Sequence, residues 1–224
     1  MSDNITLIRR RESALATNAV LRNTYILLSL TLLFSALTAS WAMFSLAPPL
    51  NPFVTLLGYI GLLFLTTRLR NSGWGIVSVF ALTGFMGYTL GPVLNVYLHH
   101  VVNGQQIVIT CLGTTGVIFM ALSLFTLITK KDFSFMGSFL MMGLLVAFLV
   151  SLAGLLFHMP VGMMAASAMF VLLSSGIILY KTSQIIHGGE TNYIMATIDL
   201  YVALYNIFVS LLMLLGGNGG SSRD

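Results

Sequence analysis

The chain is a succession of long apolar stretches separated by short polar or proline-containing segments. A helix needs about 20 apolar residues to cross about 30 Å of hydrocarbon, and each stretch comes close to that length. The predicted membrane spans cover residues 24–46, 49–67, 74–98, 105–128, 135–157, 161–180 and 194–215. For the sixth span, which directly follows His158 and Pro160, a tilted or re-entrant path is an alternative.

Composition supports this interpretation. Hydrophobic residues make up 57% of the chain and charged residues 7%, and the mean hydropathy is +0.96. The apolar runs are continuous, whereas barrel strands alternate polar and apolar residues, so the sequence predicts an all-α membrane protein with seven transmembrane helices. The single cysteine, Cys111, excludes a disulfide within the chain and argues against a cysteine-based metal site. No cofactor is expected.

Basic residues give the expected topology. Four arginines fall in the N-terminal segment 1–23, and the remaining basic residues fall after even-numbered spans or at the C-terminus. They are Arg68, Arg70, Lys130, Lys131, Lys181 and Arg223. The positive-inside rule then predicts a cytoplasmic tail over residues 1–23, a membrane domain over 24–215 and a short flexible tail over 216–224 outside the cytoplasm. This distribution explains the net charge of +4 without a nucleic-acid partner, and the lipid bilayer is the expected surrounding.

Asp199 is the one carboxylate inside a predicted span. An aspartate at a helix centre costs about 2.5–3.5 kcal/mol on insertion scales, which the apolar residues of the same span offset. If the helix begins at Ile194, Asp199 lies about 7.5 Å along its axis, near one membrane face. Ala203, Asn206 and Ser210 follow at helical spacings, so this face is expected to look inward.

Other polar positions predict a partly polar interior. Asn95, Asn206 and Tyr201 are candidates to line it, although hydrogen bonding between helices is the alternative structural role. Gly91 and Pro92 predict a bend in the third span, and Asn95, one turn later, is expected to use the carbonyl groups that the proline frees.

Small residues recur at helical spacings and predict close approach between helices. They are Gly58, Gly61, Gly84, Gly87, Gly91, Gly113 and Gly116.

His187 and Glu190 flank two glycines between the last two spans. Three or more convergent ligands are needed for a metal site, so a tight cytoplasmic turn is the simpler interpretation. An enzyme is not expected. An intramembrane aspartyl protease needs two carboxylates within the spans, and a rhomboid-like protease needs GxSG, which the text LSSG at 173–176 lacks.

The stretch GIVSVFALTGFMGYTLGPVLN resembles the signature of the Bax-inhibitor (transmembrane Bax inhibitor motif) family, and SGIILYKTSQIIHGGETNYIMATIDLYVALYNIFVSLLMLLG resembles the end of its bacterial branch. The resemblance runs through nearly the whole chain. It implies seven helices with the last one surrounded by the others, and a bacterial inner-membrane location. It also implies a partner, the membrane-anchored ATP-dependent protease FtsH, which such a protein binds and restrains.

Other members of this family are described as pH-sensitive calcium leak channels with a pair of aspartates as sensor. A cation leak, with calcium as candidate ion, is therefore the alternative function. Here the corresponding positions are Lys181 and Ala203, and neither is acidic. Asp199 lies one turn before Ala203, so an ion pair between Lys181 and Asp199 is the hypothesis for the cytoplasmic side, and it would hold that side shut.

Overall fold

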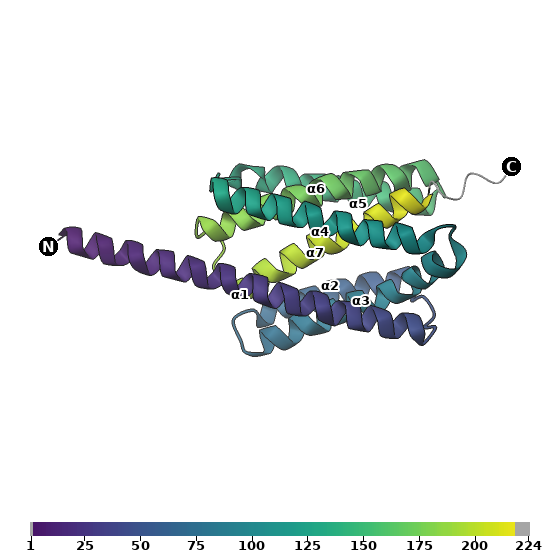
Figure 1. Ribbon diagram of the computed structural model, residues 1–224, viewed down its shortest axis with the longest axis horizontal. Coiled ribbons are helices and arrows are strands. Elements are labelled where there is room, and N and C mark those ends of the chain that lie inside the picture. The colour runs from purple at the N-terminus through teal and green to yellow at the C-terminus, as the bar shows by residue number, and fades with distance from the viewer. Residues whose placement is uncertain (1, 218–224) are drawn as a thin grey trace.

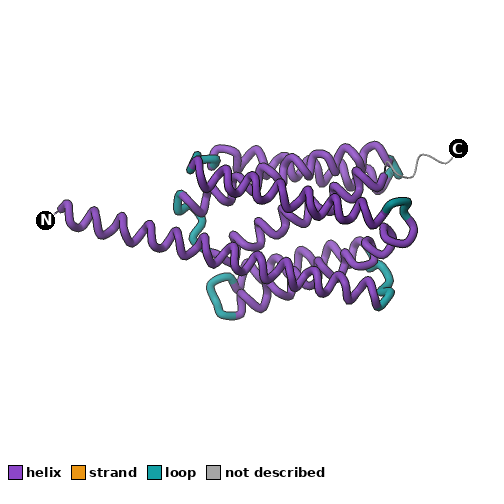
Figure 2. Tube along the Cα trace, viewed as in Figure 1, coloured by secondary structure: helices purple, strands orange, loops and turns teal. Residues whose placement is uncertain are grey.

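The computed structural model describes residues 2–217, with side chains described from Thr17 onward. The helices are α1 (Ser2–Phe44), α2 (Pro52–Leu69), α3 (Trp74–His100), α4 (Gly104–Thr129), the 3-10 turn η1 (Ser134–Met136), α5 (Gly137–Leu156), α6 (Pro160–Ile186) and α7 (Tyr193–Gly217). Figure 2 shows loops only at the two ends of the bundle. Within the described residues, seven helices are long and apolar enough to cross a membrane, which confirms the predicted all-α membrane fold.

The helices form two groups with α7 between them. Helices α1–α3 lie on one side and α4–α6 on the other, and α7 crosses the space between the groups diagonally (Figure 1). It packs against α1, α3, α4 and α6, and its side chains Ile198, Leu200 and Ile207 are buried in the main core. The last helix is therefore central, as the resemblance implies. Helix α2 packs mainly on α3, and α5 mainly on α6, so both are peripheral.

Helix α6 differs from its predicted bounds. It is one unbroken helix of 27 residues, and it ends at Ile186 rather than near Tyr180. Thr182, Ser183 and Ile185 are fully buried, so packing continues the helix beyond the apolar run that marks the span. Lys181 is consequently a helix residue and not part of the connector.

The predicted N-terminal tail has a helical backbone. Helix α1 runs from Ser2 to Phe44 without a break, so it joins this segment to the first predicted span. The segment contains no proline or glycine and is rich in good helix formers, which allows the span to extend as one helix. Its first turns project beyond the bundle (Figure 1). The first two residues of the expected flexible tail over 216–224 belong to the last helix, which ends at Gly217, and residues 218–224 lie outside the described residues.

The predicted close approach of helices is realised at one interface in particular. A Cβ atom on Gly91 would lie 2.7 Å from the carbonyl oxygen of Ala39, and one on Gly87 would collide with the carbonyl oxygen of Ser35. Helices α1 and α3 therefore pack backbone to backbone. A Cβ atom on Gly61 of α2, or on Gly113 or Gly116 of α4, would meet nothing within 4 Å, so the packing prediction is wrong for these three glycines.

Candidate functional site

The central charged feature of the bundle is an ion pair between α6 and α7. The Nζ atom of Lys181 lies 2.7 Å from Oδ2 of Asp199, and the two side chains are 22% and 29% exposed. The ammonium group also lies 5.5 Å from the ring centroid of Tyr180. Asp199 is about 9 Å along the axis from the start of α7 at Tyr193, so the pair lies toward one end of the bundle. Neither charge is left alone in the hydrocarbon layer.

The family's second sensor position holds no acid. Ala203 is 1% exposed and packs in the main core, one turn beyond Asp199. The predicted inward face of α7 is confirmed for Ala203 and Ser210, which are buried, whereas Asp199 and Asn206 are half-buried. The arrangement is thus one acid with its counter-ion, which is chemically different from two carboxylates that share a proton.

Tyr201 joins three helices. Its side chain is 1% exposed, and its hydroxyl donates to the carbonyl oxygen of Thr83 on α3 at 3.2 Å. The hydroxyl oxygen of Ser35 on α1 lies 2.6 Å from the hydroxyl oxygen of Tyr201. Because Tyr201 donates its proton to Thr83, Ser35 is the donor in this second bond. Buried polar groups are costly unless they are paired, so this three-way contact fixes how α7 lies against α1 and α3.

Asn95 also connects helices, but not as predicted. Its amide group donates to the carbonyl oxygen of Met43 on α1 at 3.3 Å, so it does not use a carbonyl freed by Pro92. The prediction is wrong because the packing of α1 on α3 brings the carbonyl groups at the end of α1 within reach of Asn95. Tyr97 acts similarly, since its hydroxyl donates to the carbonyl oxygen of Leu212 on α7 at 2.8 Å.

Three connectors meet at the end of the bundle from which α1 projects (Figure 1). We call residues 70–73, 130–133 and 187–192 together the connector face. Ser183, in the last turn of α6, accepts from the backbone N–H of Phe133 at 2.9 Å and donates to the carbonyl oxygen of Lys131 at 3.2 Å. The Gln184 amide donates to the hydroxyl of Ser134 at 2.6 Å. The connector after α4 is therefore fixed to α6.

Asn192 ties the other two connectors together. Its amide group donates to the carbonyl oxygen of Arg70 at 3.1 Å and to the side-chain oxygen of Asn71 at 3.0 Å. Its own side-chain oxygen accepts from the N–H groups of Ile194 and Met195, which is the contact of a helix N-cap. The start of α7 is thus anchored to the end of α2.

His187 and Glu190 lie in the connector between α6 and α7, with Gly188 at a φ of 74°. His187 is exposed and donates from Nδ1 to the carbonyl oxygen of Ser183 at 2.9 Å, and Glu190 accepts from the N–H of Asn192 at 2.9 Å. Each is engaged in local turn contacts. Among the described residues, no group of three or more His, Cys, Asp or Glu side chains is placed to hold a metal ion.

Asp132 on the connector face makes folding stability depend on pH. Its carboxyl group accepts a hydrogen bond from the N–H of Ser134 at 2.8 Å. Hydrogen bonds with Ser134 have the largest effect on the pKa of Asp132, and the nearby His187 has a smaller one. Both lower this pKa below the ordinary value of 3.8. Because the pKa of Asp132 is lower in the folded protein than in the unfolded chain, Asp132 stabilises the folded protein fully above its ordinary pKa. This stabilisation is lost as pH falls through the pKa that Asp132 has in the folded protein.

The Asp132→Asn variant keeps an oxygen that accepts the same bond but does not titrate. Between about pH 7 and about pH 3, the melting temperature in mild detergent is expected to fall further for the unchanged chain than for this variant. An equal fall in melting temperature for both proteins would show that Asp132 does not contribute to the loss of stability at acid pH.

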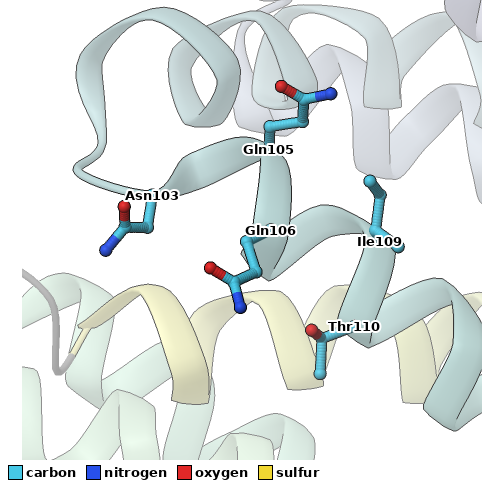
Figure 3. A pocket seen from close by; sticks show the side chains of 5 residues that line it. All are labelled: Asn103, Gln105, Gln106, Ile109 and Thr110. Carbon is cyan, nitrogen blue, oxygen red and sulfur yellow. The ribbon is translucent and has the colours of Figure 1, made fainter.

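A shallow pocket of about 540 Å³ lies at the opposite end of the bundle, at the start of α4. Its polar lining residues are Asn103, Gln105, Gln106 and Thr110. Figure 3 shows that these side chains spread apart instead of pointing toward one centre. It has no convergent set of groups of the kind that binds a small molecule.

Sequence reasoning missed three of the residues that organise these contacts, namely Ser35, Ser183 and Asn192. Asn192 carries a readable signal, because an asparagine directly before an apolar helical run is a typical N-cap. Ser35 and Ser183 carry none, since serines within apolar helices usually bond to their own backbone.

Seven membrane-spanning helices, the last of them central, with hydrogen bonds joining the helices, define an all-α polytopic membrane protein. Residues 17–220 match the family described as inhibitor of apoptosis-promoting Bax1, and the chain belongs to this family. It is 53% identical over 203 residues to an uncharacterised protein of Pseudomonas aeruginosa, covering 91% of each chain. It is also 50% identical over 214 residues to the modulator of FtsH protease YccA of Escherichia coli, covering 96% of this chain and 95% of the relative. An uncharacterised membrane protein of Vibrio cholerae is 44% identical over 206 residues, covering 92% of each.

Proposed function

We propose that this protein binds and restrains the FtsH protease in a bacterial inner membrane, with its N-terminus and connector face in the cytoplasm and its C-terminus on the other side. The observation that carries the proposal is the identity of 50%, over nearly the full length of both chains, to a protein named as a modulator of that protease. The same protein, from a second Escherichia coli strain, is named as an inner-membrane protein.

Two structural features support a regulatory binding role. One connector of this face is hydrogen-bonded to α6 and the other two are hydrogen-bonded to each other, so the face offers a defined surface to a partner. From the same end, the first turns of α1 extend beyond the bundle (Figure 1). A segment of about 15 residues reaches about 22 Å as a helix and up to about 50 Å when extended, which is long enough for a partner to grasp.

The direct test is co-purification. Extracted from bacterial membranes in mild detergent, the protein is expected to carry FtsH with it, whereas an unrelated seven-helix protein of similar abundance does not. Failure to recover FtsH from membranes that contain both proteins would contradict the proposal.

We also propose that FtsH engages the N-terminal tail of this protein as that of a slow substrate, so removing residues 2–8 is expected to slow its degradation several-fold while leaving co-purification unchanged. The shortened tail gives the protease less chain to engage, but the connector face remains. The measurement is the half-life after synthesis is stopped, in cells with and without active FtsH. Removal of residues 218–224, the same number of residues at the other end, is the matched control and is expected to leave the half-life unchanged. Equal half-lives for the two deletion variants would show that FtsH does not engage this protein through its N-terminal tail.

The cation-leak alternative gains no support from these features. That alternative rested on Asp199 and on other members of the family, and Asp199 is paired with Lys181. No relative is named as a calcium channel among those described above.

A further inference from the structure

A groove of about 460 Å³ opens sideways from the bundle, away from the connector face and the ion pair. Its floor is the middle of α7, and its walls come from α1 and α4, with a contribution from α3. The lining residues from α1 and α4 are Leu32, Ser35, Ala36, Ala39, Ser40, Val108, Leu112, Thr115, Gly116 and Phe119, and those from α3 and α7 are Leu90, Leu94, Tyr201, Leu204, Tyr205 and Phe208.

Helices α1 and α4 form no extensive interface with each other, which leaves room for the groove between them. They come close where the rings of Tyr25 and Phe119 lie 5.9 Å apart. Farther along, Ala36 of α1 and Gly116 of α4 are both exposed, and a Cβ on Gly116 would have nothing within 4 Å. Small side chains on both walls therefore leave α7 accessible from the side.

The depth of the groove limits what can fill it. Its floor lies in the middle third of α7, and its walls lie within the apolar spans of α1 and α4. At this depth the surroundings are lipid tails. An unfilled apolar groove would forfeit the dispersion contacts of its lining, so hydrocarbon is expected to enter.

Three of the five hydroxyl groups in the lining are already paired. The hydroxyl of Tyr201 contacts Ser35 and Thr83, and the hydroxyl of Thr115 donates to the carbonyl oxygen of Cys111 at 2.7 Å. Water or a polar headgroup would find few free partners on these groups. The groove is thus suited to an apolar occupant.

Size separates a lipid chain from a partner's helix. A helix about 10 Å in diameter takes up about 420 Å³ for each turn of 5.4 Å. A groove of about 460 Å³ would therefore seat little more than one turn of a membrane-crossing helix. A slender, flexible acyl chain fits the same volume over a greater length.

We propose that this groove between α1, α4 and α7 holds one acyl chain of a bilayer phospholipid. The site is independent of FtsH binding. It places a lipid chain against the central helix, where lipids that only surround the protein do not reach.

The test uses the purified full chain in vesicles that contain a phospholipid with a photoreactive diazirine in the middle of one acyl chain. After irradiation, peptide mass spectrometry is expected to find adducts on the α7 segment with Leu204 and Phe208, which are each 6% exposed. Adducts restricted to outward-facing residues would overturn the proposal. The same labelling in native membranes distinguishes a partner's helix as the occupant, because a helix seated in the groove there would exclude the lipid and remove the α7 adducts.

Gly116→Phe fills the groove and is expected to abolish the α7 adducts. Gly113→Phe is the matched control, because Gly113 also has open space at its Cβ, lies in the same helix and does not line the groove. It is expected to keep them. Ala36→Leu narrows the groove from the opposite wall, so loss of the adducts in this variant as well excludes misfolding of one variant as the cause. Adducts that persist in both groove variants would show that the chain does not lie there.

Discussion

Replacing Lys181 by methionine is expected to destabilise the protein by about 2–3 kcal/mol. The change removes the cation that lies 2.7 Å from Asp199 and leaves the carboxylate without a partner inside the span. Breaking a fully buried pair costs about 3–5 kcal/mol, and the partial exposure of both side chains reduces that figure. The measurement is the unfolding midpoint in a mixed-micelle titration with a denaturing detergent.

The double variant Lys181→Met with Asp199→Leu is the control that isolates the pair. It leaves no unpaired charge, so it is expected to recover most of the stability that the single variant loses. A double variant as unstable as Lys181→Met would mean that the lysine stabilises α6 through its packing, for example on Tyr180, and not through the ion pair.

The second large effect is expected at Gly87. A Cβ atom there would collide with the carbonyl oxygen and hydroxyl of Ser35 and with the hydroxyl of Thr38. Backbone atoms cannot move aside as a flexible side chain can, so Gly87→Ala is expected to cost about 2–3 kcal/mol by forcing α1 and α3 apart. The displacement would also pull Ser35 away from Tyr201, to which it is bonded.

Gly113→Ala provides the matched comparison in the same assay. Its Cβ meets nothing within 4 Å, so the helix is expected to gain a little, about 0.5–1 kcal/mol, from the better helix former. Similar midpoints for the two variants would contradict the close packing of α1 on α3.

The helices could be predicted from the sequence because the backbone N–H and C=O groups of each apolar run must hydrogen-bond to one another within lipid. Charges and prolines mark where the runs stop, which placed most ends within a few residues. Hydropathy could not find the last turns of α6, because Thr182 and Ser183 are polar and yet fully buried by neighbouring helices. Nor could it show that helix α1 begins at Ser2.

The candidate site was predictable where charge dictates partners. A lone acid in a span needs a cation, and Lys181 is the basic residue within reach on the neighbouring helix. The contacts of Tyr201 and Asn95 were not predictable, because each bonds to a specific atom of another helix. Which carbonyl or hydroxyl comes within reach depends on helix rotation, and that rotation is set by packing over the whole bundle.

We expect the connector face to meet FtsH in the cytoplasm. A photo-crosslinking residue in place of His187, exposed on that face, or in place of Asn103, exposed at the opposite end, tests it in intact membranes. The account predicts an adduct with FtsH from position 187 and none from position 103. Capture of FtsH from position 103 alone, or from neither position, would contradict it.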